Sequence, residues 1–134
     1  MPAILIPHNL AEPVRVVRLF GDVPGANTIC DALQTLVGGY FELLQIPERL
    51  GPKLEKLPGC HLWINEDGKR LELPMNSRAT DLCLDTCVSL HSADYIAGNA
   101  VISCGMDMKD VWGGPPGEHW HPPQWVLDRW GLKI

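Results

Sequence analysis

The fold is decided by one short stretch of the sequence, Leu33-Gln34-Thr35-Leu36-Val37-Gly38-Gly39-Tyr40-Phe41-Glu42-Leu43-Leu44, in which a helix ends and a strand begins. From Ile29 to Val37, apolar residues recur at i, i+3, i+4, i+7 and i+8, the pattern of a helix with one buried face. Gly38 follows the last helical position, where a left-handed conformation costs glycine little, and Gly39 lets the chain reverse. The aromatic and aliphatic residues at 40–44 then predict a strand.

Further elements are predicted on both sides of this joint. Residues 3–6 and 14–20 favour a strand hairpin, and Asn27 or Thr28 is expected to cap the helix. Residues 60–65 and 69–73 flank Asp67-Gly68, a dipeptide typical of a tight hairpin turn. Residues 80–85 suit a short strand or a turn of helix, and residues 95–103 suit a central strand with a glycine bulge.

Two segments are expected to lie outside this sheet. Residues 47–59 are charged and contain three prolines, so we expect a surface excursion with at most one short helical turn. The Gly- and Pro-rich break at 113–117 precedes a predicted short helix at 122–130. If Trp125 and Trp130 were exposed to water, they would form an apolar patch that promotes association. This helix must therefore pack on the sheet or on a partner.

The expected fold class is therefore α+β, with a mixed, mostly antiparallel sheet of about five strands and one helix packed across it. We expect a single domain over residues 1–112 and a C-terminal extension over residues 113–134, which carries the Trp-rich helix. A chain of 134 residues with 46% hydrophobic content is long enough to bury one core.

Charge and hydropathy exclude some classes of protein. The net charge is −5, with 16 acidic and 11 basic residues and no basic cluster, which argues against binding along extended nucleic acid. One or two arginines can still hold a small anionic ligand. No apolar run approaches the roughly 18 residues that cross a membrane, and we expect a cytoplasmic protein. Five cysteines without paired short spacings predict free thiols and no disulfides.

A metal site is one candidate for chemistry. In an extended segment the imidazoles of His119 and His121 project to the same side, and Cys104 can complete a site for a divalent metal. Glu118, or a thiol of the pair Cys83 and Cys87, is an alternative third ligand. The competing interpretation is that both histidines are exposed or hydrogen-bonded, because H-x-H often occurs by chance.

Nucleophilic and phosphate-binding motifs are missing from the sequence. There is no G-x-S-x-G pattern, no papain-like cysteine pattern and no G-x-x-x-x-G-K-[ST] loop. The glycine pair at 38–39 follows a helix instead of opening one, so it cannot present a ring of helix N-terminal amides to a phosphate. We therefore expect no catalytic residues.

Four motifs carry a resemblance to a known family. They are LVGGY-x-E at 36–42, N-E-x-G-K at 65–69, L-P-x-N at 73–76 and G-x-A-V at 98–101. Over roughly residues 3–105 the chain resembles a family of small domains of unknown function from phages, plasmids and actinobacteria. The resemblance implies the fold and a mobile-element context, and it brings no established activity.

A ligand site is the second candidate. Asn76 and Arg78 lie in a loop that matches the family pattern, although Ser77 stands where the family often has a second basic residue. Arginine offers a planar fork to phosphate or carboxylate, asparagine can bind a base edge, and Tyr40 or Trp63 can stack. In the structural alternative Asn76 caps a turn and Arg78 pairs with Glu42 or Glu72. Residues 65–69 are interpreted as a structural turn.

The leading hypothesis is a non-catalytic accessory protein of a phage or mobile element, which binds a host protein or sequesters a small nucleotide-like ligand near Tyr40, Asn76 and Arg78. The alternative is a metal-binding module or metal-dependent enzyme that uses His119, His121 and Cys104. A third hypothesis is an assembly role for the tail helix. An uncovered sheet edge and the tryptophans also favour a homodimer.

Overall fold

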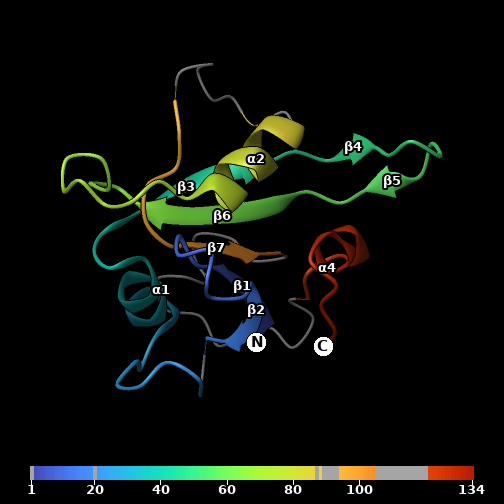
Figure 1. The fold of residues 1–134 in the computed structure, drawn as a ribbon. Coiled ribbons are helices and arrows are strands. Elements are labelled where there is room, and N and C mark those ends of the chain that lie inside the picture. Colours follow the sequence, from blue (N-terminus) through green and yellow to red (C-terminus); the bar gives the residue numbers. More distant parts are fainter. Residues whose placement is uncertain (1, 20, 87, 89–93, 105–120) are drawn as a thin grey trace.

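The protein is an α+β fold built on one five-stranded sheet (Figure 1). The computed structural model describes residues 2–19, 21–86, 88, 94–104 and 121–134. The strand order is β2-β1-β7-β6-β3, and every neighbouring pair is antiparallel. The strands are β1 (Pro2–Ile6), β2 (Arg15–Arg18), β3 (Phe41–Ile46), β6 (Cys60–Asn65) and β7 (Ala100–Ser103). The expected fold class is confirmed.

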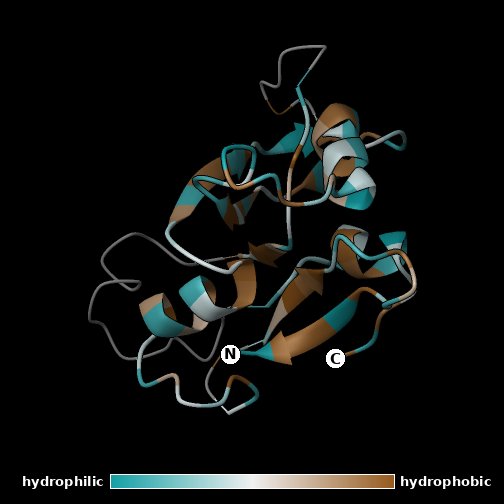
Figure 2. Ribbon diagram, turned by 60° about the vertical axis from the view of Figure 1, so that its left-hand side comes forward, coloured by the Kyte–Doolittle hydropathy of each residue, from teal (hydrophilic) through white to brown (hydrophobic). Residues whose placement is uncertain are grey.

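The described helices cover both faces of the sheet. Helix α1 (Ile29–Val37) packs on one face, and α2 (Ser77–Asp85) and α4 (Gln124–Arg129) pack on the other (Figure 1). The alternation of a strand explains this arrangement, because Leu5 belongs to the α1 cluster while Ile4 and Ile6 belong to the α2 and α4 cluster. In Figure 2 the inner strands are mainly hydrophobic and the helices carry alternating hydrophobic and hydrophilic bands.

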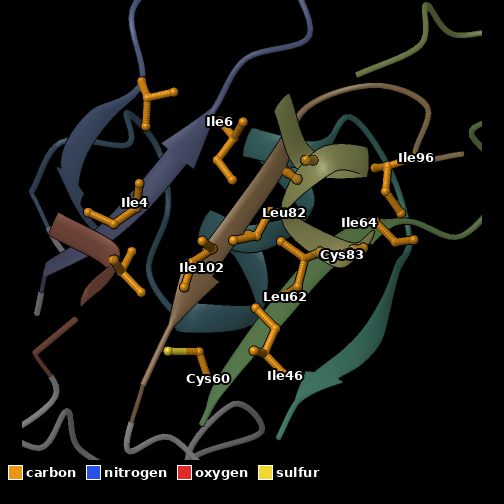
Figure 3. Packing of buried hydrophobic residues seen from close by; sticks show 14 of the residues in the cluster. Ile4, Ile6, Ile46, Cys60, Leu62, Ile64, Leu82, Cys83, Ile96 and Ile102 are labelled. Carbon is orange, nitrogen blue, oxygen red and sulfur yellow. The ribbon is translucent and has the colours of Figure 1, made fainter. Parts of the chain in front are cut away.

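The larger apolar cluster lies between the sheet and helices α2 and α4. Leu82 of α2 lies close to Leu62 and Ile102 of the sheet (Figure 3), and Val126 of α4 belongs to the same cluster with no exposed surface. The Trp-rich helix thus docks on the sheet through its apolar face, one of the two outcomes that its sequence predicted. The indole N–H of Trp125 also donates to the Pro58 carbonyl (2.9 Å).

The joint between α1 and β3 forms as its sequence predicts. The Thr28 hydroxyl caps the helix by accepting from the Asp31 N–H (3.0 Å). At the other end Gly38 has a φ of 83°, in the left-handed region, and its N–H donates to the Gln34 carbonyl (2.9 Å). Strand β3 starts at Phe41, three residues after the helix cap.

Several expected elements differ in the structure. Residues 69–73, predicted as a strand, form turns, because the N–H groups of Leu71 and Leu73 donate locally to the carbonyls of Asp67 and Gly68. Residues 47–59 carry a small hairpin of β4 (Arg49–Leu50) and β5 (Lys56–Leu57). The strand expected over 95–103 is confined to Ala100–Ser103, and residues 80–85 belong to a full helix, α2.

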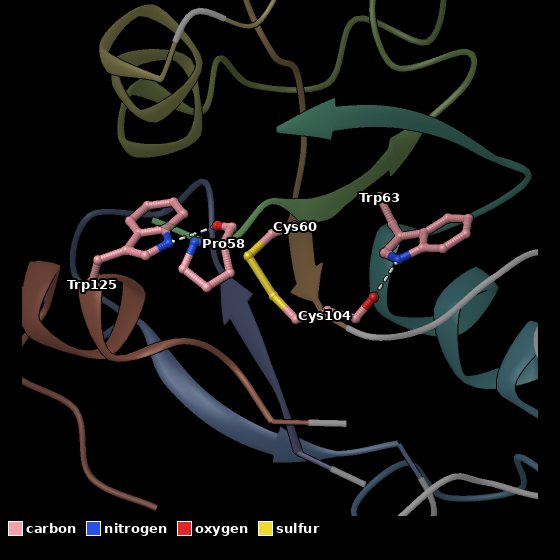
Figure 4. The surroundings of a disulfide bond; sticks show 6 residues. Pro58, Cys60, Trp63, Cys104 and Trp125 are labelled. Atoms are coloured by element: carbon pink, nitrogen blue, oxygen red, sulfur yellow. Dashed lines mark hydrogen bonds between the residues drawn. A yellow bond between two sulfur atoms is a disulfide. The ribbon is translucent and has the colours of Figure 1, made fainter. Parts of the chain in front are cut away.

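The expectation of no disulfides is wrong, because Cys60 and Cys104 are joined (Figure 4). His61 pairs with Ser103 in the β6–β7 register, which places Cys60 directly opposite Cys104 at the next position. Their Cα atoms are 4.7 Å apart, close to the spacing of a non-hydrogen-bonded antiparallel pair. Sequence spacing could not reveal this contact, since the two cysteines are 44 positions apart in the chain.

The part of the chain that the structure describes includes no helix with the length and apolar composition needed to cross a membrane.

Candidate ligand-binding site

A cavity of about 430 Å³ opens at the β3 side of the sheet, on the face that α2 covers. Its floor is formed by Leu44 of β3 and Ile64 of β6, and Glu42 of β3 lies at its rim. One wall is the turn at 65–70, and the other is the segment at 94–97. We call this space the β3–β6 cavity. Its volume falls in the range of small-molecule sites, which is about 300–1,000 Å³.

The turn at 65–70 is held by buried Asn65. The Asn65 amide donates to the Val37 carbonyl at the end of α1 (3.1 Å), and its side-chain oxygen accepts from the Asp67 N–H (2.8 Å). Gly68 lies against the opposite wall, where a Cβ would come within 2.8 Å of the Ala97 carbonyl oxygen. Glycine is therefore required at 68 by close contact between the two walls.

The wall at 94–97 is anchored from below by α2. The Ile96 N–H donates to the Thr80 hydroxyl (2.9 Å), and the Ile96 carbonyl accepts from the Asn76 N–H (2.7 Å). At the top, the Lys69 ammonium forms an ion pair with Asp94 and lies 5.1 Å from the centre of the Tyr95 ring. Tyr95 is 36% exposed, so part of its surface is accessible to a ligand.

The charges around the cavity are of both signs. Arg70 is paired with Asp67 (3.2 Å), and hydrogen bonding to this carboxylate together with its charge raises the pKa of Arg70. With the Lys69 and Asp94 pair, both bases of the cavity have acidic partners. Glu42 and Glu66, both exposed, take part in none of the ion pairs among the described residues. The apolar floor is thus surrounded by a polar rim with a negative balance.

Asn76, predicted as a ligand residue, is fully buried and serves the fold. It caps α2 by accepting from the Ala79 N–H (3.0 Å). Its amide group donates to the carbonyls of Ile6 (2.8 Å) and Gly98 (2.9 Å). The side chain therefore ties together β1, α2 and the segment before β7, in agreement with the structural alternative of a capping residue.

Arg78 is likewise engaged by the main chain. One guanidinium nitrogen donates to the carbonyls of Pro7 (2.7 Å), Asn9 (3.1 Å) and Glu12 (2.9 Å) in the β1–β2 loop. These acceptors replace the Glu42 or Glu72 pairing that the sequence suggested. Arg78 thus closes this loop over the start of α2.

The third predicted ligand residue, Tyr40, is 71% exposed at the start of β3 and does not line the β3–β6 cavity. Trp63, the other aromatic candidate, is fully buried and donates from its indole N–H to the Ser103 hydroxyl (2.8 Å; Figure 4). The structure therefore does not assemble Tyr40, Asn76 and Arg78 into one pocket.

Of the candidate metal ligands, His119 lies outside the described residues, along with Glu118 and Cys87. His121 is exposed, and Cys104 is bonded to Cys60. A disulfide sulfur is not the thiolate that binds metal, so a site with Cys104 requires that this bond be reduced. Within the described ranges, no three His, Cys, Asp or Glu side chains are grouped to hold a metal ion.

Comparison with known proteins gives a family for this chain. A family model, described as a domain of unknown function and designated DUF3846, matches residues 3–113. The chain belongs to the DUF3846 family. No curated protein and no solved structure matches it.

In this DUF3846 domain, the four sequence motifs lie close together around the cavity walls. Asn65 of the N-E-x-G-K motif contacts the glycine pair, since a Cβ on Gly39 would lie 3.1 Å from the Asn65 amide nitrogen. The L-P-x-N and G-x-A-V motifs meet where the Gly98 N–H donates to the Pro74 carbonyl (2.7 Å). The motifs therefore specify how helix, turn and strand pack together.

The residues that sequence reasoning missed are those on the cavity rim of the DUF3846 domain, mainly Glu42, Lys69 and Tyr95. The sequence signal for Lys69 is the N-E-x-G-K motif, whose local pattern indicates only a turn. No sequence signal connects Lys69 with Tyr95 or Glu42. These residues come together only when β3 pairs with β6 and the segment at 94–97 crosses the turn at 65–70.

Proposed function

We propose that this protein is a non-catalytic accessory protein of a phage or other mobile element, and that it acts by binding a ligand in the β3–β6 cavity. The mobile-element context comes from the family resemblance described above. The place of action that fits this context is the cytoplasm of the host. The two classes of ligand are a segment of a host protein and a small nucleotide-like molecule.

The observation that carries the proposal is the cavity itself. A space of about 430 Å³ combines an aliphatic floor, Leu44 and Ile64, with a partly exposed aromatic ring and charged groups at the rim. Binding sites in proteins have this composition, because apolar surface supplies affinity and a few polar groups orient the ligand. The ion pair between Lys69 and Asp94 links the two walls at the rim.

The experiment compares two exposed tyrosines. Binding is measured by isothermal titration against a panel of linear and cyclic nucleotides and by pull-down from host lysate. We expect Tyr95→Ala to weaken binding about tenfold, because loss of a stacking face typically has an effect of this order. Tyr40→Ala removes an equally large ring outside the cavity and should leave binding unchanged.

Two results would count against the proposal. The first is that neither the nucleotide panel nor the lysate yields a ligand. The second is that Tyr40→Ala and Tyr95→Ala weaken binding equally, which would place the site elsewhere on the surface. Circular dichroism of both variants checks that the fold is retained.

A further inference from the structure

Among the described residues, β3 has a strand neighbour on one side only, and its other edge lies beside the cavity. It is the last strand in the sheet order, next to β6 (Figure 1). The Glu66 N–H donates to the Tyr40 carbonyl (2.8 Å), and Phe41 is paired with Asn65 at the next position. Hydrogen-bonded pairs alternate along an antiparallel ladder, so the main-chain groups of Leu43 and Gln45 point away from β6. They are oriented to pair with an additional strand.

The opposite edge of the sheet is closed at one end. On β2 the Arg18 N–H donates to the Asp22 carboxylate (2.8 Å), and the Arg18 carbonyl accepts from the Asp22 N–H (3.1 Å). This loop occupies main-chain groups at the end of β2, a common way to protect an edge strand from pairing. Strand addition is therefore favoured at β3 over β2.

The open edge and the cavity share residues. Glu42 and Leu44 belong to β3, and both line the cavity. In an added strand, the residues opposite Glu42 and Leu44 would project to the same face of the sheet, about 5 Å from them. A peptide on this edge would thus place every second side chain over the cavity.

The charge of the cavity selects the kind of peptide. Its lining contains the acidic residues Glu42, Glu66, Asp67 and Asp94 and the bases Lys69 and Arg70, so four negative and two positive charges leave a balance of −2. Each base is already paired with an aspartate. Glu42, on the edge strand itself, and Glu66, in the adjoining turn, form no ion pair with any residue that the structure describes. This arrangement favours a cationic group and disfavours a nucleotide anion.

We propose that the occupant of this site is an extended, basic segment of a partner protein, which adds to β3 as a sixth strand and places a lysine or arginine side chain against Glu42 and Glu66. This inference rests on the proposed function and selects the protein ligand over the nucleotide. Main-chain hydrogen bonds to Leu43 and Gln45 give affinity, and the carboxylates give specificity.

The test uses peptides on the intact protein. The probe is an eight-residue peptide of alternating lysine and valine, with glutamate in place of lysine in one control. A second control keeps the lysines but has N-methyl groups on alternate amides, which removes the main-chain donors. We expect the lysine peptide to bind at least tenfold more tightly than either control, and to bind more weakly as salt concentration rises.

Protein variants separate the main-chain pairing with β3 from the charge interaction with Glu42 and Glu66. Gln45→Pro removes an N–H that points away from β6, so the hydrogen bonds between β3 and β6 are kept. We expect this variant to bind the lysine peptide at least tenfold more weakly. The control Gln45→Ala keeps the N–H and should retain binding. Glu42→Gln and Glu66→Gln should each weaken binding about threefold at low salt. Glu12→Gln removes the same charge from the distant β1–β2 loop and should have no effect.

Each contrary result has a distinct meaning. Equal binding of the N-methylated peptide would overturn the inference, because charge alone would then explain the attraction. A nucleotide that binds in a Tyr95-dependent manner, with no peptide binding, would overturn the inference and leave the proposed function standing. A homodimer that Gln45→Pro dissociates, with no peptide binding, would assign the edge to a second copy and also overturn it. If neither ligand class binds, both proposals fail.

Discussion

Gly38 carries the turn from helix to strand because of its backbone conformation. Its φ of 83° is one that residues with a side chain adopt at a cost. Space is not the constraint, since a Cβ at this position would meet only the Asn65 amide nitrogen at 3.9 Å. The requirement for glycine at 38 is thus conformational, whereas at Gly68 it is steric.

Substitution of Gly38 tests this distinction. We expect Gly38→Ala to lower the free energy of unfolding by about 1–2 kcal/mol, because alanine is strained in the left-handed region. Gly38→Asn should lose less, since asparagine tolerates this conformation. Urea denaturation monitored by circular dichroism measures both. Equal losses for alanine and asparagine would show that the backbone angle is not what matters.

Cys83 is the buried free thiol among the described residues, and its surroundings change its acidity. Cys83 lies on the buried face of α2, and this burial raises its pKa to about 11, because desolvation penalises the thiolate. Cys30 is only half-buried, and its pKa is also raised, by desolvation and by the neighbouring Asp31 carboxylate.

We therefore expect the folded protein to protect Cys83 from alkylation at pH 8, while Cys30 reacts faster. A thiol whose pKa is raised by folding stabilises the protein fully below its unfolded pKa near 9, and this contribution is lost as the pH rises towards 11. Mass spectrometry after iodoacetamide treatment gives the site-specific rates. Modification of Cys83 at the rate seen in urea would contradict the buried position.

At the scale of elements, α2 and α4 complete the same apolar layer by different means. Helix α2 is tied to the sheet by the buried hydrogen bonds of Asn76, whereas α4 has Val126 and Leu127 as its buried residues. Helix α4 is also joined to α2 by an ion pair between Arg129 and Asp85 (2.7 Å), which is exposed and contributes little. Docking of α4 thus depends on apolar burial.

Truncation of a buried side chain on α4 should reveal this dependence. We expect Leu127→Ala to lower the free energy of unfolding by about 2–3 kcal/mol, the lower part of the range for buried leucines, because it lies near the chain end. Asp128→Ala, at the next and exposed position, should change it by less than about 0.5 kcal/mol. If both variants match the parent protein in urea titrations, α4 is not docked in solution.

At the scale of the whole molecule, the disulfide joins the first residue of β6 to the residue that follows β7. Cys60 and Cys104 close a loop of 44 residues between β6 and β7, which contains α2 and both walls of the cavity. A cross-link of this length restricts the unfolded chain, and the loop-entropy model gives a stabilisation of about 4 kcal/mol.

Reduction should therefore lower the unfolding midpoint. We expect a reductant to lower the melting temperature of the parent protein by roughly 10–15 °C, since each 1 kcal/mol shifts the midpoint of a domain of this size by about 3–4 °C. The double variant Cys60→Ser and Cys104→Ser should already have the lower melting temperature and should not respond to reductant. A parent protein that melts identically with and without reductant would show that the bond does not form in solution.

The local part of this fold could be predicted from sequence. Thr28 and Gly38 bound α1 as expected, because a capping hydroxyl and a left-handed glycine act through their immediate neighbours. The strands of the sheet followed from β propensity and turn signals, since the predicted segments 3–6, 14–20, 40–44, 60–65 and 95–103 each overlap one of them. Local patterns failed at 69–73, where Asp67-Gly68 predicted a hairpin but close packing of Gly68 on Ala97 favours a compact turn.

Helix α1, the strands and the joint between them are predictable from local sequence, because propensity, capping and periodicity act over a few residues. Three contacts emerge only from the packed fold: Cys60 lies opposite Cys104, Asn76 binds carbonyls from β1 and from the segment before β7, and Glu42 shares a cavity with Tyr95. These contacts depend on strand register between segments far apart in the chain. Register is set by how the whole sheet buries its two faces, so no single stretch of sequence encodes it.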